Sequence, residues 1–438
     1  MPVNKDFYTL AGSSGQSTGY TIDQSIRFNA ADNAYMHRTP SSTGNRKTFT
    51  SSFWVKLGNI EVNTSLPTPQ VTHGAGSSGL ALVANEGTLT AYTYYSGSWS
   101  GFLKTNRVFR DPTAWYHFVY IVDSTQSVAS ERIRIYVNGI RESSFSTETY
   151  LAQNQDTDWN LSGEKMWLGR DGGGSGYDGE YYAAEIHWLD GYAYGPEYFG
   201  EFDENGIWIP KEYTGSYGTN GFKIDGRDSS DLGDDESGNG NDFTTVSLAA
   251  NDQKADTPTN NHCVMNNLVP GSATFSNGNL DLSHSASAWT AARGTIGIPY
   301  NSGIYYYEAK VLSHAIYLSF GWGDVDMGQN QNSNPATPKY YVYSDYSGKY
   351  YSSTDDGSIG DGFTNNDVIG LWYDSGSTSN NLKFYRNGTL QSSGTKSFDF
   401  SDVAHVTAVT LYNGSNSVEY RFAADEWTQA PSGITAAN

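Results

Sequence analysis

Residues 185–190, EIHWLD, place two carboxylates and a histidine on one predicted strand. Retaining hydrolysis of a glycoside needs two carboxyl groups about 5 Å apart. Because side chains alternate between the two faces of a strand, Glu185 shares a face with Leu189, while Asp190 points to the other face. Only one carboxylate is left on the face of Glu185, so the sequence predicts that the chain is not an enzyme.

No other catalytic pattern is present in the sequence. It has no HExxH helix and no GxxxxGKS/T phosphate loop, and its GxSxG match, GQSTG at 15–19, lies in the Gly- and Ser-rich N-terminal stretch and not at a strand-to-helix turn. His117 falls in an alternating strand and is interpreted as structural. The histidines do not have the spacing of paired metal ligands. They include His73, His117, His187, His262, His284, His314 and His405.

Aromatic residues in three Gly- and Ser-rich stretches are better candidates for ligand binding. Aromatic rings pack on the apolar faces of pyranose sugars, and neighbouring Asn, Asp and Gly groups can satisfy the sugar hydroxyls. The stretches are TYYSGSWSGF at 93–102, GGGSGYDGEYY at 172–182 and SDYSGKYYSS at 344–353. They supply the candidate ligand-binding residues Tyr94, Tyr95, Trp99, Tyr177, Tyr181, Tyr346 and Tyr350, with Tyr351 beside them.

The alternative for many of these rings is packing in the core or at subunit contacts. We expect a core position for the tryptophans that lie within predicted strands, namely Trp54, Trp115, Trp167, Trp188 and Trp372.

Two acidic stretches are candidates for calcium, which takes about six to eight oxygen ligands. Residues 227–243, RDSSDLGDDESGNGNDF, include Asp234 and Asp242, and a second candidate pair, Asp171 and Asp178, flanks GGGSGY. The first stretch lacks the DxDxDG spacing and the Glu at position twelve of an EF-hand loop. A solvated acidic linker explains it equally well, so we expect no metal or cofactor and keep calcium as the alternative.

The charge balance excludes some classes of partner. The 438-residue chain has 26 Lys and Arg against 47 Asp and Glu, a formal net charge of −21. Proteins that bind nucleic acid or anionic membranes show basic patches, so neither partner is expected. The single cysteine, Cys263, allows no internal disulfide. No stretch approaches the roughly 20 apolar residues of a membrane span, and no apolar export signal is visible at the N-terminus, so we expect folding in a cytoplasm.

One short sequence motif occurs twice and indicates how the chain is organised. RIRIYVNG at 132–139 and LKFYRNG at 382–388 each alternate apolar and polar residues up to an Asn-Gly pair. Asn-Gly favours the type I′ turn of a β-hairpin, because both turn positions need a positive φ. The other strand-like segments are also short and separated by turn signals. We therefore predict an all-β chain with two antiparallel β-sandwich (jelly-roll) domains in tandem.

The composition also predicts the domain boundaries. Residues 1–20 are Gly- and Ser-rich and are interpreted as an N-terminal arm, with a frayed terminus as the alternative. We assign residues 21–225 to the first sandwich with a C-terminal extension, and residues 226–262 to an acidic linker. The second sandwich then covers residues 263–438.

Residues 25–200 contain SIRFN, TFTSSFWVK, WYH, IRIYVNG and MWLGRDGGGSGYDGEYYAAEIHWLDG in this order. In these pieces the first domain resembles the concanavalin A-like lectin/glucanase superfamily, in its laminin-G-like branch. Glucanases of that superfamily carry an Asp two residues after the first catalytic Glu, and here His187 stands in that place. Residues 273–424 are similar to a SPRY-type sandwich, with GIYYYEAKV, GLWYD and LKFYRNG in the expected order.

The two domains, combined with TPSSTGNRKTFT at 39–50 and FGEFDENGIWIPKEYTGSYGTNGFKID at 199–225, resemble tail-fibre and other structural proteins of bacteriophages. The resemblance implies a virion protein at the tail or capsid surface, assembled in the host cytoplasm with other virion proteins and released by lysis. It further implies a homo-oligomer, by analogy a trimer, that binds a host-surface glycan or receptor. The alternatives are a capsid decoration or head-fibre protein with an architectural role only, and a polysaccharide depolymerase.

Overall fold

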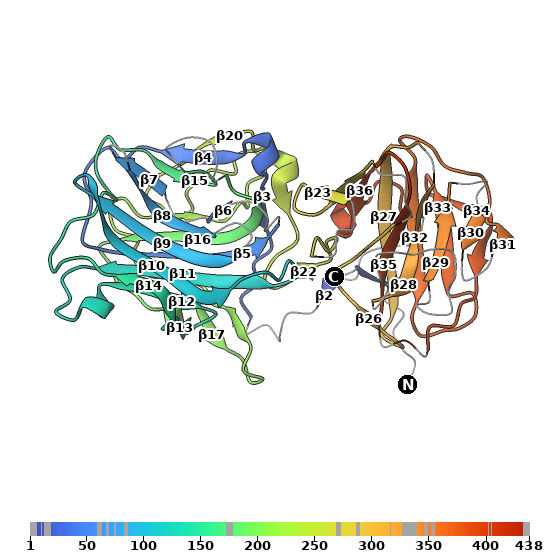
Figure 1. The fold of residues 1–438 in the computed structure, drawn as a ribbon, viewed down its shortest axis with the longest axis horizontal. Coiled ribbons are helices and arrows are strands. Elements are labelled where there is room, and N and C mark those ends of the chain that lie inside the picture. The colour runs from blue at the N-terminus through green and yellow to red at the C-terminus, as the bar shows by residue number, and fades with distance from the viewer. Residues whose placement is uncertain are drawn as a thin grey trace. The chain divides into compact units, whose positions relative to one another are not determined.

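The computed structural model describes residues 7–9, 11–12, 19–58, 64–66, 70–73, 76–82, 86–171, 178–268, 273–285, 290–315, 317–325, 340–345, 349–351, 355–401, 403 and 405–431. The chain divides into two compact units (Figure 1). The N-terminal unit is Ser13–Asn261, and the C-terminal unit is Met1–Gly12 with His262–Asn438. Over the described ranges the only helical segments are 3-10 turns: η1 (Ala30–Asp32), η2 (Ala129–Glu131), η3 (Pro196–Tyr198), η4 (Ala250–Asp252) and η5 (Ala424–Glu426). Within these same ranges, no helix has the length and apolar character needed to cross a membrane.

Two antiparallel sheets build the N-terminal unit. One sheet has the order β13 (Ile140–Arg141), β12 (Ile133–Val137), β11 (Trp115–Asp123), β5 (Thr48–Leu57), β16 (Tyr181–Asp190), β3 (Ser25–Phe28) and β21 (Gln253–Lys254), with β19 (Phe222–Ile224) paired to β16. The other has the order β14 (Phe145–Thr149), β10 (Ser98–Val108), β9 (Thr88–Tyr95), β8 (Gly76–Leu82), β7 (Gln70–His73), β15 (Met166–Leu168), β4 (Tyr35–Arg38) and β20 (Thr244–Val246), with β6 (Thr64–Ser65) paired to β8. A separate hairpin pairs β17 (Gly200–Phe202) with β18 (Trp208–Pro210).

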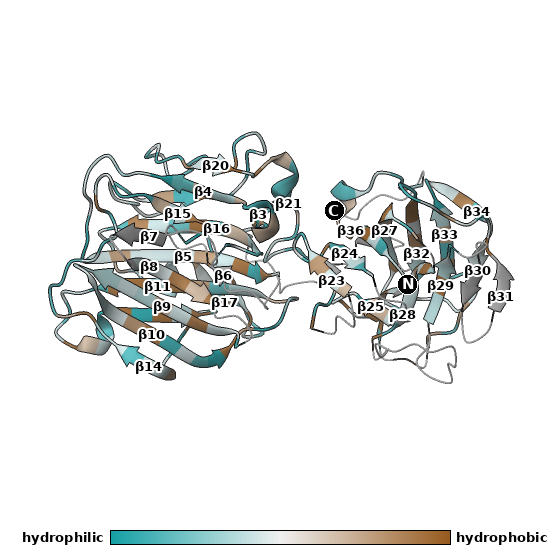
Figure 2. Ribbon diagram, turned by 45° about the horizontal axis from the view of Figure 1, so that its top comes forward, coloured by the Kyte–Doolittle hydropathy of each residue, from teal (hydrophilic) through white to brown (hydrophobic). Residues whose placement is uncertain are grey.

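Side chains from both sheets fill the space between them. On β12, the alternate residues Ile133, Ile135 and Val137 are buried in the core. Leu80 of β8 and Leu103 of β10, from the opposing sheet, belong to the same hydrophobic cluster. Along β10 buried residues also alternate with less buried ones, and Figure 2 shows hydrophobic and hydrophilic residues mixed along the strand. This pattern, with period two, confirms the predicted β-sandwich.

The C-terminal unit is a second sandwich. One sheet has the order β23 (Ala273–Ser276), β24 (Asp281–His284), β36 (Asn416–Arg421), β27 (Ile304–Ser313), β32 (Val368–Asp374), β33 (Leu382–Arg386) and β34 (Thr389–Lys396). The other has the order β25 (Thr290–Arg293), β35 (His405–Tyr412), β28 (Leu318–Asp324), β29 (Tyr340–Ser344), β30 (Lys349–Tyr351) and β31 (Asp355–Ser358), with β26 (Ile298–Pro299) paired to β35. Tyr307 of the first sheet and Trp322 of the second meet edge to face, with ring centroids 5.0 Å apart.

The predicted N-terminal arm, residues 1–20, lies mostly outside the described residues. Its strand β1 (Phe7–Thr9) runs parallel to β27 of the C-terminal unit. The remaining short strands are β2 (Ala11–Gly12) and β22 (Asn261–His262).

The two copies of the repeated sequence motif form the same kind of hairpin. Asn138 and Gly139 have φ values of 48° and 76°, and Asn387 and Gly388 have the same two values. Two successive positive φ angles are what a type I′ turn needs. In each copy the Asn side chain also accepts a hydrogen bond from a backbone N–H of the neighbouring strand, at 2.7 and 2.8 Å. The predicted hairpins are therefore confirmed.

Of residues 226–262, predicted as an acidic linker, all but His262 are instead built into the N-terminal unit. They supply β20 and β21, which extend the two sheets. Two of their carboxylates form buried ion pairs, Asp252 with Arg27 at 3.0 Å and Asp256 with Lys56 at 2.7 Å. The composition is misleading here, because carboxylates that look solvated in the sequence are the partners of buried cations.

Candidate functional site

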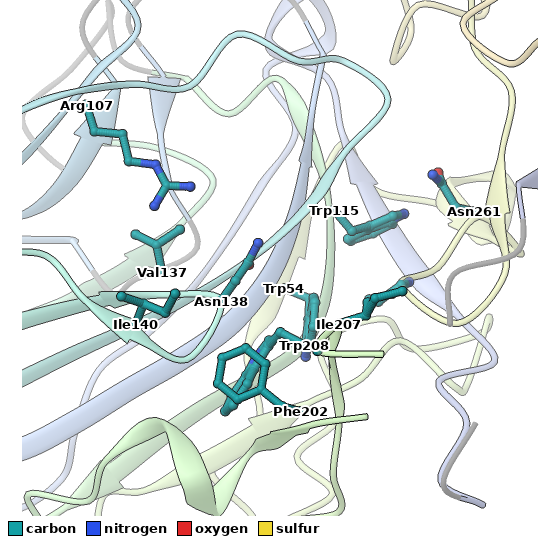
Figure 3. Close-up of a pocket in the computed structure, with 12 residues that line it drawn as sticks. Trp54, Arg107, Trp115, Val137, Asn138, Ile140, Phe202, Ile207, Trp208 and Asn261 are labelled. Carbon is teal, nitrogen blue, oxygen red and sulfur yellow. The ribbon is translucent and has the colours of Figure 1, made fainter. Parts of the chain in front are cut away.

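The N-terminal unit contains an aromatic pocket of about 370 Å³, called below the Trp208 pocket. Ligand pockets in proteins typically span about 300–1,000 Å³, so it has room for a small ligand. Its lining combines three indoles and a phenyl ring with two amides and one guanidinium. Twelve residues line it (Figure 3): Trp54, Arg107, Trp115, Val137, Asn138, Ile140, Phe202, Gly206, Ile207, Trp208, Pro258 and Asn261.

The β17–β18 hairpin brings Phe202 and Trp208 to the pocket. Its turn is held by Asp203, whose Oδ1 accepts hydrogen bonds from the backbone N of Asn205 at 2.9 Å and of Ile207 at 2.7 Å. Phe202 is 51% exposed, and its ring meets that of Trp208 edge to face with centroids 4.9 Å apart. The hairpin therefore presents two apolar rings, in a fixed arrangement, to any ligand in the pocket.

Trp208 is held by contacts on several sides. Its indole lies against Gly200 of its own hairpin and Gly139 of the β12–β13 turn, where an added Cβ would overlap the ring. Its Nε1 donates a hydrogen bond to Nδ1 of His117 at 3.0 Å. The ring is half-buried, so part of it remains accessible in the pocket.

A buried histidine lies behind Trp208. The His117 ring stacks with those of Trp54 and Trp208, with centroids 4.7 and 5.9 Å away. Because the indole N–H of Trp208 can only donate, Nδ1 of His117 is the acceptor. Nε2 therefore carries the proton and donates to Oγ of Ser52 at 2.8 Å. Burial and then the charge of His187 lower the pKa of His117 to about 3, which keeps the ring neutral.

The contact between Ser52 and His117 is not that of a nucleophile and its base. A general base has to accept the proton of the nucleophile, so its lone pair must face the hydroxyl. The lone pair of His117 faces Trp208 instead, and the Ser52 side chain is fully buried. The pair supports the position of Trp208 and has a structural role.

Glu185, the carboxylate considered as a catalytic candidate, belongs to a buried charge network. Its Oε2 accepts a hydrogen bond from Nε2 of His187 at 3.1 Å, and its Oε1 lies 3.1 Å from Nζ of Lys223. Burial alone would raise the pKa of Glu185, but the hydrogen bonds and charges of His187 and Lys223 outweigh it and lower the pKa to about 2. A general acid must hold a proton near neutral pH, and Glu185 does not.

The strand that carries Glu185 has a β-bulge at this residue. Ala184 pairs with Trp54 and His187 pairs with Ser52, so β16 has one residue more than β5 in this interval. Glu185 has a φ of 49°, in the left-handed region that residues other than glycine rarely occupy. Bulges re-aim side chains, and this one carries the buried carboxylate. The sequence gives no signal for it, because the usual marker, a glycine, is missing.

Three of the predicted ligand-binding residues, Tyr94, Tyr95 and Trp99, lie on the β9–β10 hairpin. Trp99 is 56% exposed, and its ring meets those of Tyr94 and Tyr92 edge to face at 5.4 and 5.7 Å. Tyr94 is buried, and Tyr95 is half-buried with the guanidinium of Arg46 over its ring. The structure brings these residues together at a place that does not overlap the lining of the Trp208 pocket, and their role in binding stays a prediction.

Tyr181 is fully buried, which corrects its prediction as a ligand-binding residue. Its ring packs against Phe28 with centroids 5.1 Å apart, and burial raises its pKa well above the ordinary value. It lies on the inward face of β16, which the local sequence does not distinguish from the outward face. Tyr177 and Tyr346 lie outside the described residues. Tyr350 lies in β30, where its backbone pairs with β29.

The predicted calcium ligands have other partners or stand at the surface. Oδ1 of Asp178 lies 2.7 Å from Nε of Arg170, and Oδ2 of Asp171 accepts a hydrogen bond from Ser77 at 3.3 Å. In the part of the chain that the structure describes, no group of three or more His, Cys, Asp or Glu residues is placed to hold a metal ion. Asp234 and Asp242 are both exposed. The calcium alternative stays a prediction.

Sequence reasoning missed the Trp208 pocket. Trp54 and Trp115 lie in strands and are 4% and 8% exposed, as core residues should be, yet both reach the pocket. Trp208 falls in a stretch without a clear strand period. A signal is present nevertheless: Asn205-Gly206 is one of the seven Asn-Gly pairs of the chain, with Gly206 at a φ of 77°, and it indicates the turn of the hairpin that carries Trp208.

Comparison with sequence families identifies two kinds of domain in the chain. Residues 29–187 match the laminin G family described as concanavalin A-like lectin/glucanases superfamily, and residues 304–422 match the SPRY domain. The two domain resemblances expected from the sequence are thereby confirmed. Domains of these kinds typically bind without catalysing, so they suggest a carbohydrate- or protein-binding role. A search of curated proteins found no match.

A search of solved structures found matches to parts of the chain. The SPRY domain of human HERC1 matches with a TM-score of 0.30 and 17% identity, over 36% of this chain and 96% of that one. A human SPRY domain matches with a TM-score of 0.28 and 13% identity, over 34% of this chain and 95% of that one. The native heptameric SAP-like pentraxin from Limulus polyphemus matches with a TM-score of 0.30 and 13% identity, over 40% of this chain and 78% of that one.

Proposed function

We propose that the chain is a non-enzymatic binding protein whose N-terminal unit takes a carbohydrate in the Trp208 pocket. The observation that carries the proposal is the pair of accessible rings, Phe202 and Trp208, beside the amide of Asn138. Apolar faces of pyranose rings pack on aromatic side chains. Oδ1 of Asn138 accepts a hydrogen bond from the backbone N of His117, and among the described residues its Nδ2 has no partner, so it can donate to a sugar hydroxyl.

Two features support binding over catalysis. Glu185 is ionised and engaged with His187 and Lys223, so it has no proton to give to a leaving group. His117 directs its lone pair at Trp208 and its proton at Ser52. Neither group is free to move a proton to or from a sugar in the pocket.

We further propose that the chain is a virion structural protein of the tail-fibre or adhesin type, which presents this pocket to a host-surface glycan. Its support is the sequence resemblance to bacteriophage structural proteins, together with a composition that is rich in Gly and Tyr and only 17% charged. A fibre subunit of this kind is a homo-oligomer, expected to be a trimer, that contacts other virion proteins and assembles in the host cytoplasm. A purely architectural decoration protein is the alternative.

A glycan array probed with the purified full chain tests the binding. We expect Trp208→Ala to lower the affinity for the glycans that bind by about tenfold or more, as removal of a central aromatic contact typically does. Phe202→Ala serves as a second variant, because an exposed ring is removed with little effect on folding. Trp99→Ala is the matched control, an exposed tryptophan of the same unit outside the pocket, and it should bind like the wild type.

The outcomes separate the alternatives. An array on which the wild type binds no glycan would contradict the carbohydrate proposal. Affinity that falls with Trp99→Ala and not with Trp208→Ala would move the site to the β9–β10 hairpin. Incubation with host polysaccharide should release no reducing ends, and a release that disappears in Glu185→Gln would show an enzyme.

The proposed role as a virion protein is tested separately. Electron microscopy of particles labelled with antibodies against the chain should place it on the tail, and a label confined to the capsid would favour the decoration protein. Light scattering on the purified chain should give the mass of a trimer. A monomer at all concentrations would contradict the expected oligomer.

A further inference from the structure

The Trp208 pocket differs in charge from the chain that contains it. The chain carries 47 acidic against 26 basic residues, yet the twelve residues that line the pocket include no carboxylate and a single cation, Arg107. Another pocket of the same unit shows the contrast, because its lining has both signs of charge: Glu131, Glu142 and Glu148 with Arg134 and Arg141. The Trp208 pocket is therefore a local positive site on an acidic protein.

Arg107 is available to a ligand. It lies near the end of β10 and is exposed, and among the described residues no carboxylate pairs with its guanidinium. The group lies over the ring of Phe109, 5.1 Å from the centroid. This cation–π contact restrains the side chain while leaving its N–H groups to donate. In Figure 3 the guanidinium lies on the side of the pocket formed by Val137 and Asn138.

We propose that the Trp208 pocket selects an acidic sugar, a pyranose that carries a carboxylate, and that Arg107 holds this carboxylate. The inference rests on the proposed carbohydrate function and names the ligand class for the same site. A guanidinium is planar and can pair with a carboxylate through two parallel hydrogen bonds, a fit that an ammonium does not offer. The sugar ring then packs on Phe202 and Trp208, and Nδ2 of Asn138 donates to a hydroxyl.

The net charge of the chain does not prevent this selection. Electrostatic interactions are screened over about 8 Å at physiological ionic strength, so carboxylates elsewhere on the protein act weakly on a ligand in the pocket. Arg107 acts at contact distance, where a hydrogen bond between charged groups is about twice as strong as one between neutral groups. The local cation therefore outweighs the distant negative charges.

Calorimetric titration of the full chain tests the inference with two probes, a trisaccharide of uronic acids and the same trisaccharide with its carboxyls reduced to alcohols. The wild type should bind the acidic probe about tenfold more tightly or better. Arg107→Gln should lose this preference and keep its affinity for the neutral probe, and Arg107→Lys should retain only part of it. Arg141→Gln, which removes the same charge from the other pocket, is the matched control and should keep the preference.

Each contrary result overturns the inference in a recognisable way. Equal affinity of the wild type for the two trisaccharides refutes the selection of acid and leaves the carbohydrate proposal standing. Tighter binding of a sulfated trisaccharide than of the carboxylated one shows that the pocket selects a sulfate and not a carboxylate. If neither probe binds, the acidic-sugar inference fails, and the comparison of Trp208→Ala with Trp99→Ala on the array decides the proposed function separately.

Discussion

The indole of Trp208 occupies the space in which any residue other than glycine at position 139 would carry its Cβ. A Cβ built on Gly139 would lie 2.4 Å from both Cε3 and Cζ3 of the indole, closer than real contacts allow. The Asn-Gly turn of the first hairpin therefore also forms the support of the central ring in the pocket. In the second hairpin, Gly388 has the same φ of 76°, but its nearest neighbour would be the carbonyl oxygen of Gln429 at 3.1 Å.

This difference makes Gly139→Ala and Gly388→Ala a matched pair. Each places an alanine at positive φ, which costs about 1–2 kcal/mol of unfolding free energy in its own unit. Gly139→Ala must in addition displace Trp208, so we expect a larger loss of stability and a clear loss of carbohydrate affinity. Calorimetric unfolding and titration measure the two effects. Unchanged affinity in Gly139→Ala would show that the pocket does not depend on this contact.

The fold could be predicted from the sequence because its signals are local. In β12 the alternation of Ile133, Ile135 and Val137 with polar neighbours indicates a half-buried strand, and Asn138-Gly139 indicates the turn that follows. Neither conclusion needs knowledge of which strands lie side by side. The same reasoning applies to the second hairpin, which is why the sandwich class was predictable for both units.

The pocket could not be predicted, because long-range pairing assembles it. Trp54, Arg107 and Trp208 come from three elements that the local pattern does not place together. The local pattern also leaves open which face of a strand is inward, as the burial of Tyr181 shows. Burial of the carboxylate of Asp256 against Lys56 likewise depends on the packing of a distant segment, and no local feature of the acidic stretch indicates it.

The ion pair between Lys56 and Asp256 yields a second prediction. The side chain of Lys56 is fully buried, and Asp256 also accepts a hydrogen bond from Nε1 of Trp115 at 3.1 Å. Removing one partner of a buried pair leaves an uncompensated charge, which costs about 3–5 kcal/mol. We expect Asp256→Asn to lower the unfolding free energy of the N-terminal unit by about 3 kcal/mol in urea titration.

Asp228→Asn is the control for this prediction, because Asp228 belongs to the same segment, is exposed, and accepts hydrogen bonds from its near neighbours Ser230 and Asp231. A surface change of this kind should alter the stability by about 0.5 kcal/mol or less. Equal, small effects of the two variants would indicate that the segment behaves as a solvated linker after all.

The buried groups behind the pocket predict how stability depends on pH. The pKa of His117 is lowered from 6.5 to about 3, and that of Glu185 from 4.5 to about 2. In the unfolded chain both groups bind protons at their ordinary pKa, so in acid the unfolded state holds more protons and the folded state loses stability. The contribution of His117 declines from about pH 6.5 towards 3, and that of Glu185 from about pH 4.5 towards 2.

One pKa unit corresponds to about 1.4 kcal/mol, and the unfolded-state histidine is already half protonated at pH 6.5, so His117 should account for about 2 kcal/mol between pH 6.5 and 4.5. Thermal unfolding followed by circular dichroism, at low protein concentration because the pI is near 4.6, measures this slope. His117→Gln should flatten it even though the variant is less stable at neutral pH. His405→Gln, at an exposed histidine of the C-terminal unit, should leave it unchanged. A flat profile in the wild type would contradict a neutral, buried His117.

The two acidic stretches considered as calcium sites predict how the protein responds to metal removal. The carboxylate of Asp178 is neutralised by Arg170 at 2.7 Å, which lowers its value as a calcium ligand. In the other acidic stretch, slight burial and then the nearby charges of Asp242 and Asp231 raise the pKa of Asp234. Like charges gathered at an exposed surface are stable without an ion, because water solvates them.

We therefore expect chelation with EDTA, and addition of calcium up to about 1 mM, the range of weak extracellular sites, to leave the unfolding temperature and the glycan affinity unchanged. Asp178→Asn and Asp234→Asn locate the site if this expectation fails. A calcium-dependent rise in unfolding temperature that Asp178→Asn abolishes would place the ion beside Arg170, and one that Asp234→Asn abolishes would place it in the acidic stretch. Because neither stretch lines the Trp208 pocket, even a bound calcium ion would act on the stability of the N-terminal unit and not on the sugar directly.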